Sequence, residues 1–228
     1  MPVYRLGPRP VFPDPRKAEP DGLLAVGGDL GAARLLQAYR RGIFPWYDEE
    51  SPILWWSPPE RAIILPGEQH LSRRTQRAMR QLDFQVKRDS CFETVIGLCA
   101  RTPRNGQDGT WITPEMQAAY LALHREGYAH SFEAFRAGRL VGGLYGLSLG
   151  AAFFGESMVS LESYGSRAAF AELCRCAWDW GFQFIDGQLP NANLAGLGAR
   201  VVSREDFLER LTQALQQPTR RGAWGDAS

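Results

Sequence analysis

The pattern of apolar and polar residues predicts helices along much of the chain after residue 62. Five stretches there have helical composition and recognisable boundary residues. Ser72 and Ser203 are placed to cap two of them, while Thr113 begins a third helix that ends at Gly127. The predicted helices cover 70–81, 91–102, 113–126, 165–180 and a stretch that begins near 203.

Apolar and aromatic runs between these helices predict the strands of one sheet. The stretch 129–160 is interrupted by Gly138 and Gly150, which indicates three antiparallel strands joined by tight turns. Residues 83–89 predict a short strand, and 182–188 a strand that is buried on both faces except at its end. This order favours an α+β fold with a mixed, largely antiparallel sheet, similar to the acetyltransferase-like (GNAT-like) fold.

The first 60 residues differ in composition from the rest of the chain. They hold ten of the fifteen prolines and three of the seven tryptophans. Because proline lacks a backbone N–H and restricts its neighbours, this segment cannot be mostly regular structure. We expect a small irregular N-terminal domain over 1–61, with one helix at 31–41 closed by Gly42, and a second domain over 62–228.

Composition indicates an ordinary globular protein. Of the 228 residues, 44% are hydrophobic and 22% are charged, and no window approaches the roughly 18 to 20 apolar residues that span a bilayer. The N-terminal stretch lacks the apolar core of a secretory signal. Four cysteines without a CxxC pair favour reduced thiols, so we expect a cytoplasmic protein with no membrane partner.

Positive charge is concentrated in one segment, although the net charge is only +1. Residues 62–106 hold eight Arg or Lys against four acids. Within this segment Arg73, Arg77 and Arg80 recur at a spacing that places them on one helical face. Such a face can bind a polyanion or can simply be solvated, and the segment alone leaves both interpretations open.

The sequence lacks common motifs for nucleotides, metals and serine nucleophiles. It contains no GxxxxGK[ST] loop, no GxGxxG that opens a helix after a strand, no HExxH and no GxSxG elbow that joins a strand to a helix, since GLSLG (146–150) lies between predicted strands. Its three histidines and four cysteines show no metal-ligand spacing. We therefore expect chemistry without a cofactor and without a bound metal.

Three polar residues are notable because they lie in apolar surroundings. Glu156 follows a Phe-Phe-Gly run, and Asp186 and Gln188 end an apolar strand, where alternation would place both on one face. A carboxylate in such a place costs desolvation energy unless it is paired or used in chemistry. Each acid alone can be a turn cap, but two such sites on neighbouring predicted strands favour a functional group.

Four tryptophans lie in loop-like contexts: Trp46, Trp55, Trp56 and Trp111. Aromatic residues in loops can build an apolar ligand pocket or a surface on which bases stack. The alternative is that they fill the core of a small irregular domain. The residues alone therefore predict a cofactor-free transferase or a binding module, with an acidic, aromatic cleft and a basic flank.

An ordered set of short motifs narrows this choice. The motifs are DGLLAVGGDL (21–30), LLQAYRRGIFPW (35–46), PILWWSPPERAII (52–64), GTWIT (109–113), AYLALHREGYAHSFE (119–133), LVGGLYGLSLG (140–150), FFGESM (153–158), FIDGQ (184–188) and GLGARVVSREDFLERL (196–211). In this order, over about residues 12–211, they resemble the signature blocks of leucyl/phenylalanyl-tRNA–protein transferases. GGDL, GIFPW, WWSP and GTWIT together are highly specific for that family.

The resemblance implies an enzyme that moves Leu or Phe, and less well Met, from charged tRNA to the α-amine of proteins with N-terminal Arg or Lys. This marks the acceptor for degradation through the N-degron pathway. By position, the resemblance assigns three groups of residues. Trp46, Trp111, Tyr120, Leu144 and Met158 correspond to the surroundings of the tRNA 3′ end and its amino acid; Arg73, Arg77 and Arg80 to residues that hold the acceptor stem; and Asp186, Gln188 and Glu156 to the catalytic polar group.

The chain departs from the family pattern at several positions, while the catalytic group is intact. Smaller residues, Val159 and Ala177 among them, can reshape the amino-acid pocket. Gly187 stands where Cys is usual and Val159 where Phe is usual; Gly165 and Arg167 replace Ala and Lys; Asn193 and Gly196 replace His and Ser.

The residues permit a mechanism that needs no nucleotide. We predict that Gln188, oriented by Asp186, accepts a hydrogen bond from the attacking amine, and that Asp186 favours the charge developing on that nitrogen. Glu156 would pair with the Arg or Lys side chain of the acceptor.

Two alternative functions remain open. One is an acyl-CoA-dependent N-acetyltransferase, although the [QR]xxGx[GA] loop is missing, and the other is a non-catalytic module that binds tRNA or N-degrons.

Overall fold

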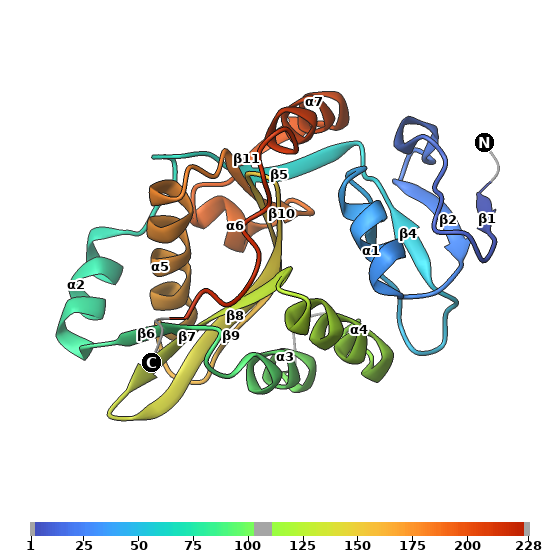
Figure 1. Ribbon diagram of the computed structural model, residues 1–228. Helices are drawn as coiled ribbons and strands as arrows, with labels where there is room; N and C mark the ends of the chain where they lie inside the picture. Colours follow the sequence, from blue (N-terminus) through green and yellow to red (C-terminus); the bar gives the residue numbers. More distant parts are fainter. Residues whose placement is uncertain (1–2, 103–110, 226–228) are drawn as a thin grey trace.

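The computed structural model describes residues 3–102 and 111–225 (Figure 1). Arg104 of the basic segment and Gly109 and Thr110 of the GTWIT motif lie outside the described residues. Across the two described ranges, no helix combines the length and the apolar character needed to cross a membrane.

The N-terminal segment forms a small four-stranded sheet beside one helix. The strand order is β1-β2-β4-β3, and the pair β1 and β2 is parallel. The sequence predicts the helix but not the sheet, because each strand has only two to five residues and prolines interrupt the apolar pattern. The elements are β1 (Tyr4–Leu6), a 3₁₀ turn η1 (Pro15–Lys17), β2 (Leu23–Gly27), α1 (Ala32–Tyr39), β3 (Phe44–Pro45) and β4 (Leu54–Trp56).

Seven strands form a second, larger sheet. Its order is β11-β5-β10-β9-β8-β7-β6, and every neighbouring pair is antiparallel except β9 and β10. The fold is thus α+β with a mixed, largely antiparallel sheet, as predicted, although the sequence pattern does not predict β5 and β11. The strands are β5 (Glu60–Ile64), β6 (Gln85–Arg88), β7 (Ala129–Arg136), β8 (Arg139–Leu149), β9 (Ala152–Ser160), β10 (Phe184–Gln188) and β11 (Arg200–Ser203).

Helices cover both faces of the large sheet. α3 and α4 lie against one face, and α5, which connects β9 to the parallel strand β10, lies against the other (Figure 1). The side chains of Ser72, Thr113 and Ser203 each accept a backbone N–H three residues further on, which confirms the three predicted caps. The helices are α2 (Arg73–Leu82), α3 (Phe92–Arg101), α4 (Pro114–Arg125), α5 (Gly165–Asp179), α6 (Ala192–Gly196), which the sequence does not predict, and α7 (Arg204–Ala214).

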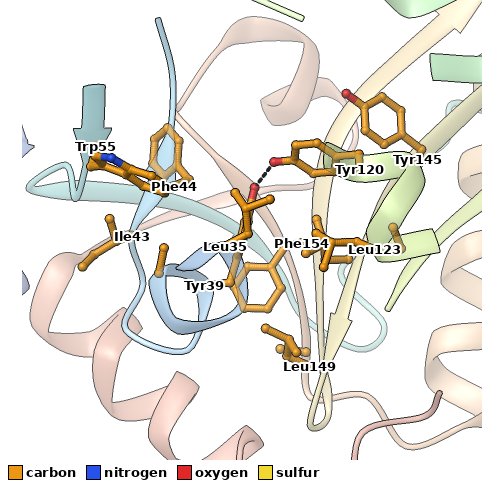
Figure 2. Close-up of a cluster of buried hydrophobic side chains, with 14 of the residues drawn as sticks. Leu35, Tyr39, Ile43, Phe44, Trp55, Tyr120, Leu123, Tyr145, Leu149 and Phe154 are labelled. Carbon is orange, nitrogen blue, oxygen red and sulfur yellow. Dashed lines mark hydrogen bonds between the residues drawn. The ribbon is translucent and has the colours of Figure 1, made fainter. Parts of the chain in front are cut away.

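One core cluster joins the two sheets. Tyr39 of α1 packs edge-on against Phe154 of β9, with ring centroids 5.2 Å apart, and both side chains are buried (Figure 2). The chain passes from the small sheet to the large one at residues 57–59, between β4 and β5. The expected domain boundary after residue 61 therefore falls inside β5. The division into two domains stays a prediction, since the apolar core continues across it.

Candidate active site

The candidate site lies at the end of β10, where the strand departs from regular geometry. Asp186 lies beside Phe154 of the parallel strand β9, but the pairing with β5 shifts register between Asp186 and Gln188. Gln188 has a φ of 64°, in the left-handed region that residues other than glycine seldom adopt. The regular alternation that the sequence predicts across these two residues is therefore broken, and the chain turns at Gln188.

Asp186 is fully buried and forms an ion pair with Arg61 of β5. Arg61 Nε donates to Oδ1 at 2.9 Å, and Nη2 donates to Oδ2 at 2.6 Å. The backbone N–H of Gln188 also donates to Oδ1, at 2.8 Å. Both carboxylate oxygens thus have donors within the protein, and Asp186 fixes the backbone of Gln188 rather than its side chain.

The guanidinium of Arg61 lies close to two aromatic rings. Its Cζ is 4.7 Å from the ring centroid of Phe44 and 4.4 Å from that of Phe207. Such contacts stabilise a cation that has lost its water, and the ion pair offsets the desolvation of both charges. Sequence reasoning missed Arg61. Its signal is a charged residue that directly precedes the apolar run 62–64, and the structure buries Arg61 together with that run while Glu60 stays exposed.

Glu156 accepts hydrogen bonds from three side chains on three different elements. The hydroxyl of Tyr39 donates to Oε1 at 2.7 Å, and that of Tyr120 donates to Oε2 at 2.9 Å. The Gln188 amide Nε2 donates to Oε1 at 2.8 Å. Desolvation by burial raises the pKa of Glu156 to about 7, against the opposing effect of the two tyrosine hydrogen bonds. A carboxyl group that titrates near neutral pH is suited to acid–base chemistry.

Tyr39 is the second residue that sequence reasoning missed. Its hydroxyl also contacts the hydroxyl of Tyr120, as Figure 2 shows. Both tyrosines are fully buried, and this burial raises the pKa of each well above its ordinary value. The sequence marks Tyr39 only as an apolar position of a helix. Its polar contact is with Glu156, 117 residues further along the chain, and no local pattern predicts such a pair.

The five residues predicted to surround the tRNA 3′ end fall into two groups. Trp46, Trp111 and Tyr120 belong to or pack against the core cluster that joins the two sheets. Leu144 and Met158 are cross-strand neighbours on β8 and β9. Leu144 belongs to a second core cluster, on the α5 side of the large sheet, and Met158 packs against that cluster. Tyr120 contacts the polar group directly. A shared pocket for all five stays a prediction.

The tryptophans of the N-terminal segment have different surroundings. Trp55 is fully buried and its Nε1 donates to the carbonyl of Gly27 at 2.9 Å, so the core interpretation holds for this residue. Trp46 and Trp56 are half-buried, with ring centroids 5.7 Å apart in an edge-on arrangement. The Nε1 of Trp56 donates to the Trp46 carbonyl at 2.7 Å, which holds the pair together.

The arginines of α2 lie on an exposed helix. No residue of α2 is buried, and Arg73, Arg77 and Arg80 are all exposed. The helix lies at the opposite side of the molecule from the small N-terminal sheet (Figure 1). This exposure suits both interpretations of the basic face, so binding of a polyanion there stays a prediction.

Metal-ligating side chains do not gather within residues 3–102 and 111–225. No group of three His, Cys, Asp or Glu in these ranges could hold a metal ion. The buried His130 instead pairs with Asp89, with Nδ1 and Oδ2 2.9 Å apart, and stacks on Trp224.

Comparison with known proteins assigns the chain to a family. The model described as "Leucyl/phenylalanyl-tRNA protein transferase" matches residues 63–212, and the model for the N-terminal domain of that transferase matches residues 28–59. The chain is 54% identical to a leucyl/phenylalanyl-tRNA–protein transferase of Anaeromyxobacter dehalogenans, over 98% of this chain and 96% of that protein. It is 53% identical to the transferase of the same name from Maridesulfovibrio salexigens, over 98% of this chain and 94% of that protein.

Similarity to solved structures is weaker. An aminoglycoside acetyltransferase from an uncultured soil metagenomic sample shares 11% identity at a TM-score of 0.35, over 66% of this chain and 97% of that one. The relatives of high identity span nearly the whole chain. The chain therefore belongs to the leucyl/phenylalanyl-tRNA–protein transferase family.

Proposed function

We propose that this aminoacyltransferase moves leucine or phenylalanine, and methionine less well, from charged tRNA to the α-amine of proteins that begin with Arg or Lys. It would act in the cytoplasm and mark those proteins for degradation by the N-degron pathway. The observation that carries the proposal is the fixed amide of Gln188. Its backbone is held by Asp186 and its side-chain nitrogen by Glu156.

The reaction needs placement more than activation. An aminoacyl ester on tRNA is already activated, and a free α-amine with a pKa near 8 loses its proton at little cost at neutral pH. Holding the amine against the ester carbonyl can contribute about 7 to 11 kcal/mol. The transfer therefore requires neither ATP nor CoA, in agreement with the absence of nucleotide motifs from the sequence.

Gln188 is the proposed contact for the attacking amine. Because its Nε2 donates to Glu156, the amide oxygen is the atom oriented to accept a hydrogen bond from the amine. Asp186 and Arg61 support this geometry through the backbone N–H of Gln188. Asp186 is thus proposed to act by position, with Arg61 balancing its charge, rather than through contact with substrate.

Glu156 is the proposed acidic partner of the acceptor. The Arg or Lys side chain that identifies the acceptor is a cation, and charge-assisted hydrogen bonds to a carboxylate are among the strong ones.

The charged tRNA would be held at two places. Its acceptor stem would lie against Arg73, Arg77 and Arg80. Leu144 and Met158, with the aromatic residues Trp46, Trp111 and Tyr120, would surround the 3′ end and its amino acid. An apolar site of this kind rejects charged amino acids through desolvation.

One assay tests the proposal against both alternatives. The protein is incubated with leucyl-tRNA and a peptide that begins with Arg, without ATP or CoA, and transfer is followed by mass spectrometry. We expect one leucine on the peptide N-terminus, and none on the matched peptide whose N-terminus is acetylated. Dependence on acyl-CoA would instead indicate an N-acetyltransferase. Binding of tRNA or peptide without transfer would indicate a non-catalytic module.

A further inference from the structure

We propose that Tyr39 is a positioning residue for Glu156, and that Tyr39, Tyr120 and the protonated Glu156 form a closed ring of hydrogen bonds in the resting protein. The ring connects three elements, because Tyr39 lies at the end of α1 in the N-terminal segment, Tyr120 lies on α4, and Glu156 lies on β9 of the large sheet. This inference deepens the proposed function, because it assigns the charge state of the acidic group that would meet the acceptor.

The number of available hydrogens supports the protonated state. Three oxygen–oxygen contacts connect the three side chains: Tyr39 to Glu156 at 2.7 Å, Tyr120 to Glu156 at 2.9 Å, and Tyr39 to Tyr120. Figure 2 shows the contact between the two tyrosines. Each hydroxyl supplies one hydrogen, so two tyrosines can satisfy two of these contacts. The third contact becomes a hydrogen bond only when the carboxyl group brings a hydrogen of its own.

With an ionised Glu156, the two hydroxyl hydrogens both point to the carboxylate. The oxygens of Tyr39 and Tyr120 then face one another with no hydrogen between them, inside a fully buried part of the core. With a protonated Glu156, every member of the ring donates one hydrogen and accepts one. Unsatisfied contacts are costly where water is excluded, so the ring favours the neutral acid.

The groups that face Glu156 agree with this charge state. Burial is the largest influence on its pKa, which rises to about 7, and the negative charge of Asp186 acts in the same direction. The positive charge of Arg61 opposes the rise, although Arg61 is committed to Asp186 through two hydrogen bonds. The polar groups around Glu156 are Tyr39 on α1, Tyr120 on α4, Arg61 on β5, and Asp186 and Gln188 on β10.

The ring has a consequence for the acceptor. At rest the site carries no net negative charge, because Asp186 is balanced by Arg61 and Glu156 holds a proton. A cationic acceptor that enters beside Glu156 favours its ionised form, so the proton leaves to solvent as the acceptor binds. Acceptor binding would then strengthen as pH rises through the pKa of Glu156.

Removal of the Tyr39 hydroxyl distinguishes the ring from a simpler arrangement. If Tyr39 only donated to a carboxylate, its loss in Tyr39→Phe would destabilise the anion and raise the pKa of Glu156. In the ring, the same change removes two hydrogen bonds from the neutral state. From the ionised state it removes one hydrogen bond and one unfavourable oxygen–oxygen contact. The ring therefore predicts a lower pKa in the variant, by about one pH unit.

The experiment is a pH titration by carbon-13 NMR of the full-length protein with labelled glutamate carboxyls. The Glu156 resonance is assigned by its absence in Glu156→Gln. We expect a midpoint near neutral pH in the unaltered protein and a lower midpoint in Tyr39→Phe. Tyr120→Phe opens the ring from its other side and should also lower the midpoint. Tyr47→Phe is the matched control, since this tyrosine lies near Thr113 and Glu115, and it should leave the midpoint unchanged.

An unchanged or higher midpoint in both Tyr39→Phe and Tyr120→Phe would overturn the ring, as would a Glu156 that titrates like an ordinary glutamate. Because the titration needs no substrate, its result stands whether or not the protein transfers leucine. Where transfer is observed, the acid limb of kcat/KM for an Arg-initiated peptide should move to lower pH in Tyr39→Phe by the same shift. An unmoved limb would contradict the inferred link to acceptor binding.

Discussion

Arg61 donates from two guanidinium nitrogens to the two carboxylate oxygens of Asp186, and both side chains are essentially excluded from solvent. The pair lies between β5 and β10 and fixes the point where β10 turns toward Gln188. It explains how a carboxylate can lie in the apolar core, since the desolvation of each charge is offset by the other.

This pair predicts a large loss of stability when one charge is removed. Asp186→Asn should lower the free energy of unfolding by about 3 to 5 kcal/mol, because it leaves the buried Arg61 cation without its partner. Denaturant unfolding measures this loss. The double variant Arg61→Met with Asp186→Asn, which removes both charges, should recover part of it. A single variant as stable as the unaltered protein would show that the pair contributes little.

Gln188 should affect the rate of transfer rather than folding. In Gln188→Asn the amide is kept, and asparagine tolerates the left-handed backbone of this position. The side chain is one methylene shorter, so it loses the 2.8 Å contact with Glu156 that orients the amide. We expect kcat to fall by about 10² or more, with the affinity for charged tRNA nearly unchanged.

Measurement of kcat, tRNA affinity and melting temperature on one preparation tests this expectation. The melting temperature should match that of the unaltered protein. A normal kcat in folded Gln188→Asn would remove Gln188 from the proposed chemistry. A loss of kcat that follows only the loss of folded protein would assign it a structural role.

The local features of this fold were predictable, while the contacts that build the site were not. The caps Ser72, Thr113 and Ser203 depend on residues within one helical turn, so their sequence signals are reliable. Arg61 and Asp186 are 125 residues apart, and Tyr39 and Glu156 are 117 apart. Their proximity depends on strand order and on the packing of α1 against the large sheet, which a local pattern does not encode.

The turn at Gln188 illustrates the same limit. Alternation along 182–188 correctly predicts a strand that ends in polar residues. The register shift arises because β10 pairs with β5, a strand that the sequence pattern does not predict. The identity and order of the polar residues were therefore accessible from the sequence, but the direction of their side chains required the sheet.

Glu156 should make stability depend on pH in the opposite sense to a carboxylate whose pKa is lowered by a salt bridge. Its pKa rises from 4.5 to about 7 on folding, so between these values the folded state binds more protons than the unfolded state. The contribution is present below about pH 4.5 and is lost as pH rises toward 7, by an amount on the order of 3 kcal/mol. Glu156→Gln cannot lose a proton, so its stability should not show this loss.

The measurement is the difference in unfolding free energy between the unaltered protein and Glu156→Gln at several pH values. Other groups cancel in this difference, including Glu133, whose pKa burial also raises. A difference that does not change between pH 4.5 and 7 would mean that folding leaves the pKa of Glu156 at its ordinary value.

The basic face of α2 should control the salt dependence of tRNA binding. Each phosphate contact releases counterions and contributes about 0.7 to 0.9 log units of affinity per decade of salt. Replacement of Arg73, Arg77 and Arg80 by alanine should flatten this slope and raise the KM for charged tRNA. Arg139→Ala, at an exposed arginine of the β8 strand, is the control and should leave the slope unchanged. An unaltered slope in the triple variant would assign these arginines to a solvated face.

Substitution of Gly165 and of Gly196 by alanine should change the free energy of unfolding in different ways. Both glycines stand where the family usually has a larger residue. A Cβ at Gly165, where the family usually has Ala, would lie 2.2 Å from the backbone oxygen of Val141. A Cβ at Gly142 of β8 would likewise lie 2.5 Å from the Gly165 carbonyl carbon. These two distances show that the start of α5 packs with its backbone directly against the backbone of β8. Neither backbone can yield by a simple side-chain rotation. Gly165→Ala should therefore lower the free energy of unfolding by about 1 to 3 kcal/mol, although it restores the common residue.

Gly196→Ala is the matched control for this prediction. A Cβ at Gly196 meets no atom within 4 Å, and the residue lies in the last turn of α6 without a positive φ. Alanine there should be neutral or stabilise the protein by up to about 1 kcal/mol, since it restricts the unfolded chain. Denaturant unfolding of the two variants measures the contrast. Equal stability of Gly165→Ala and Gly196→Ala would mean that α5 can move away from β8, and that the close backbone contact is not required by the fold.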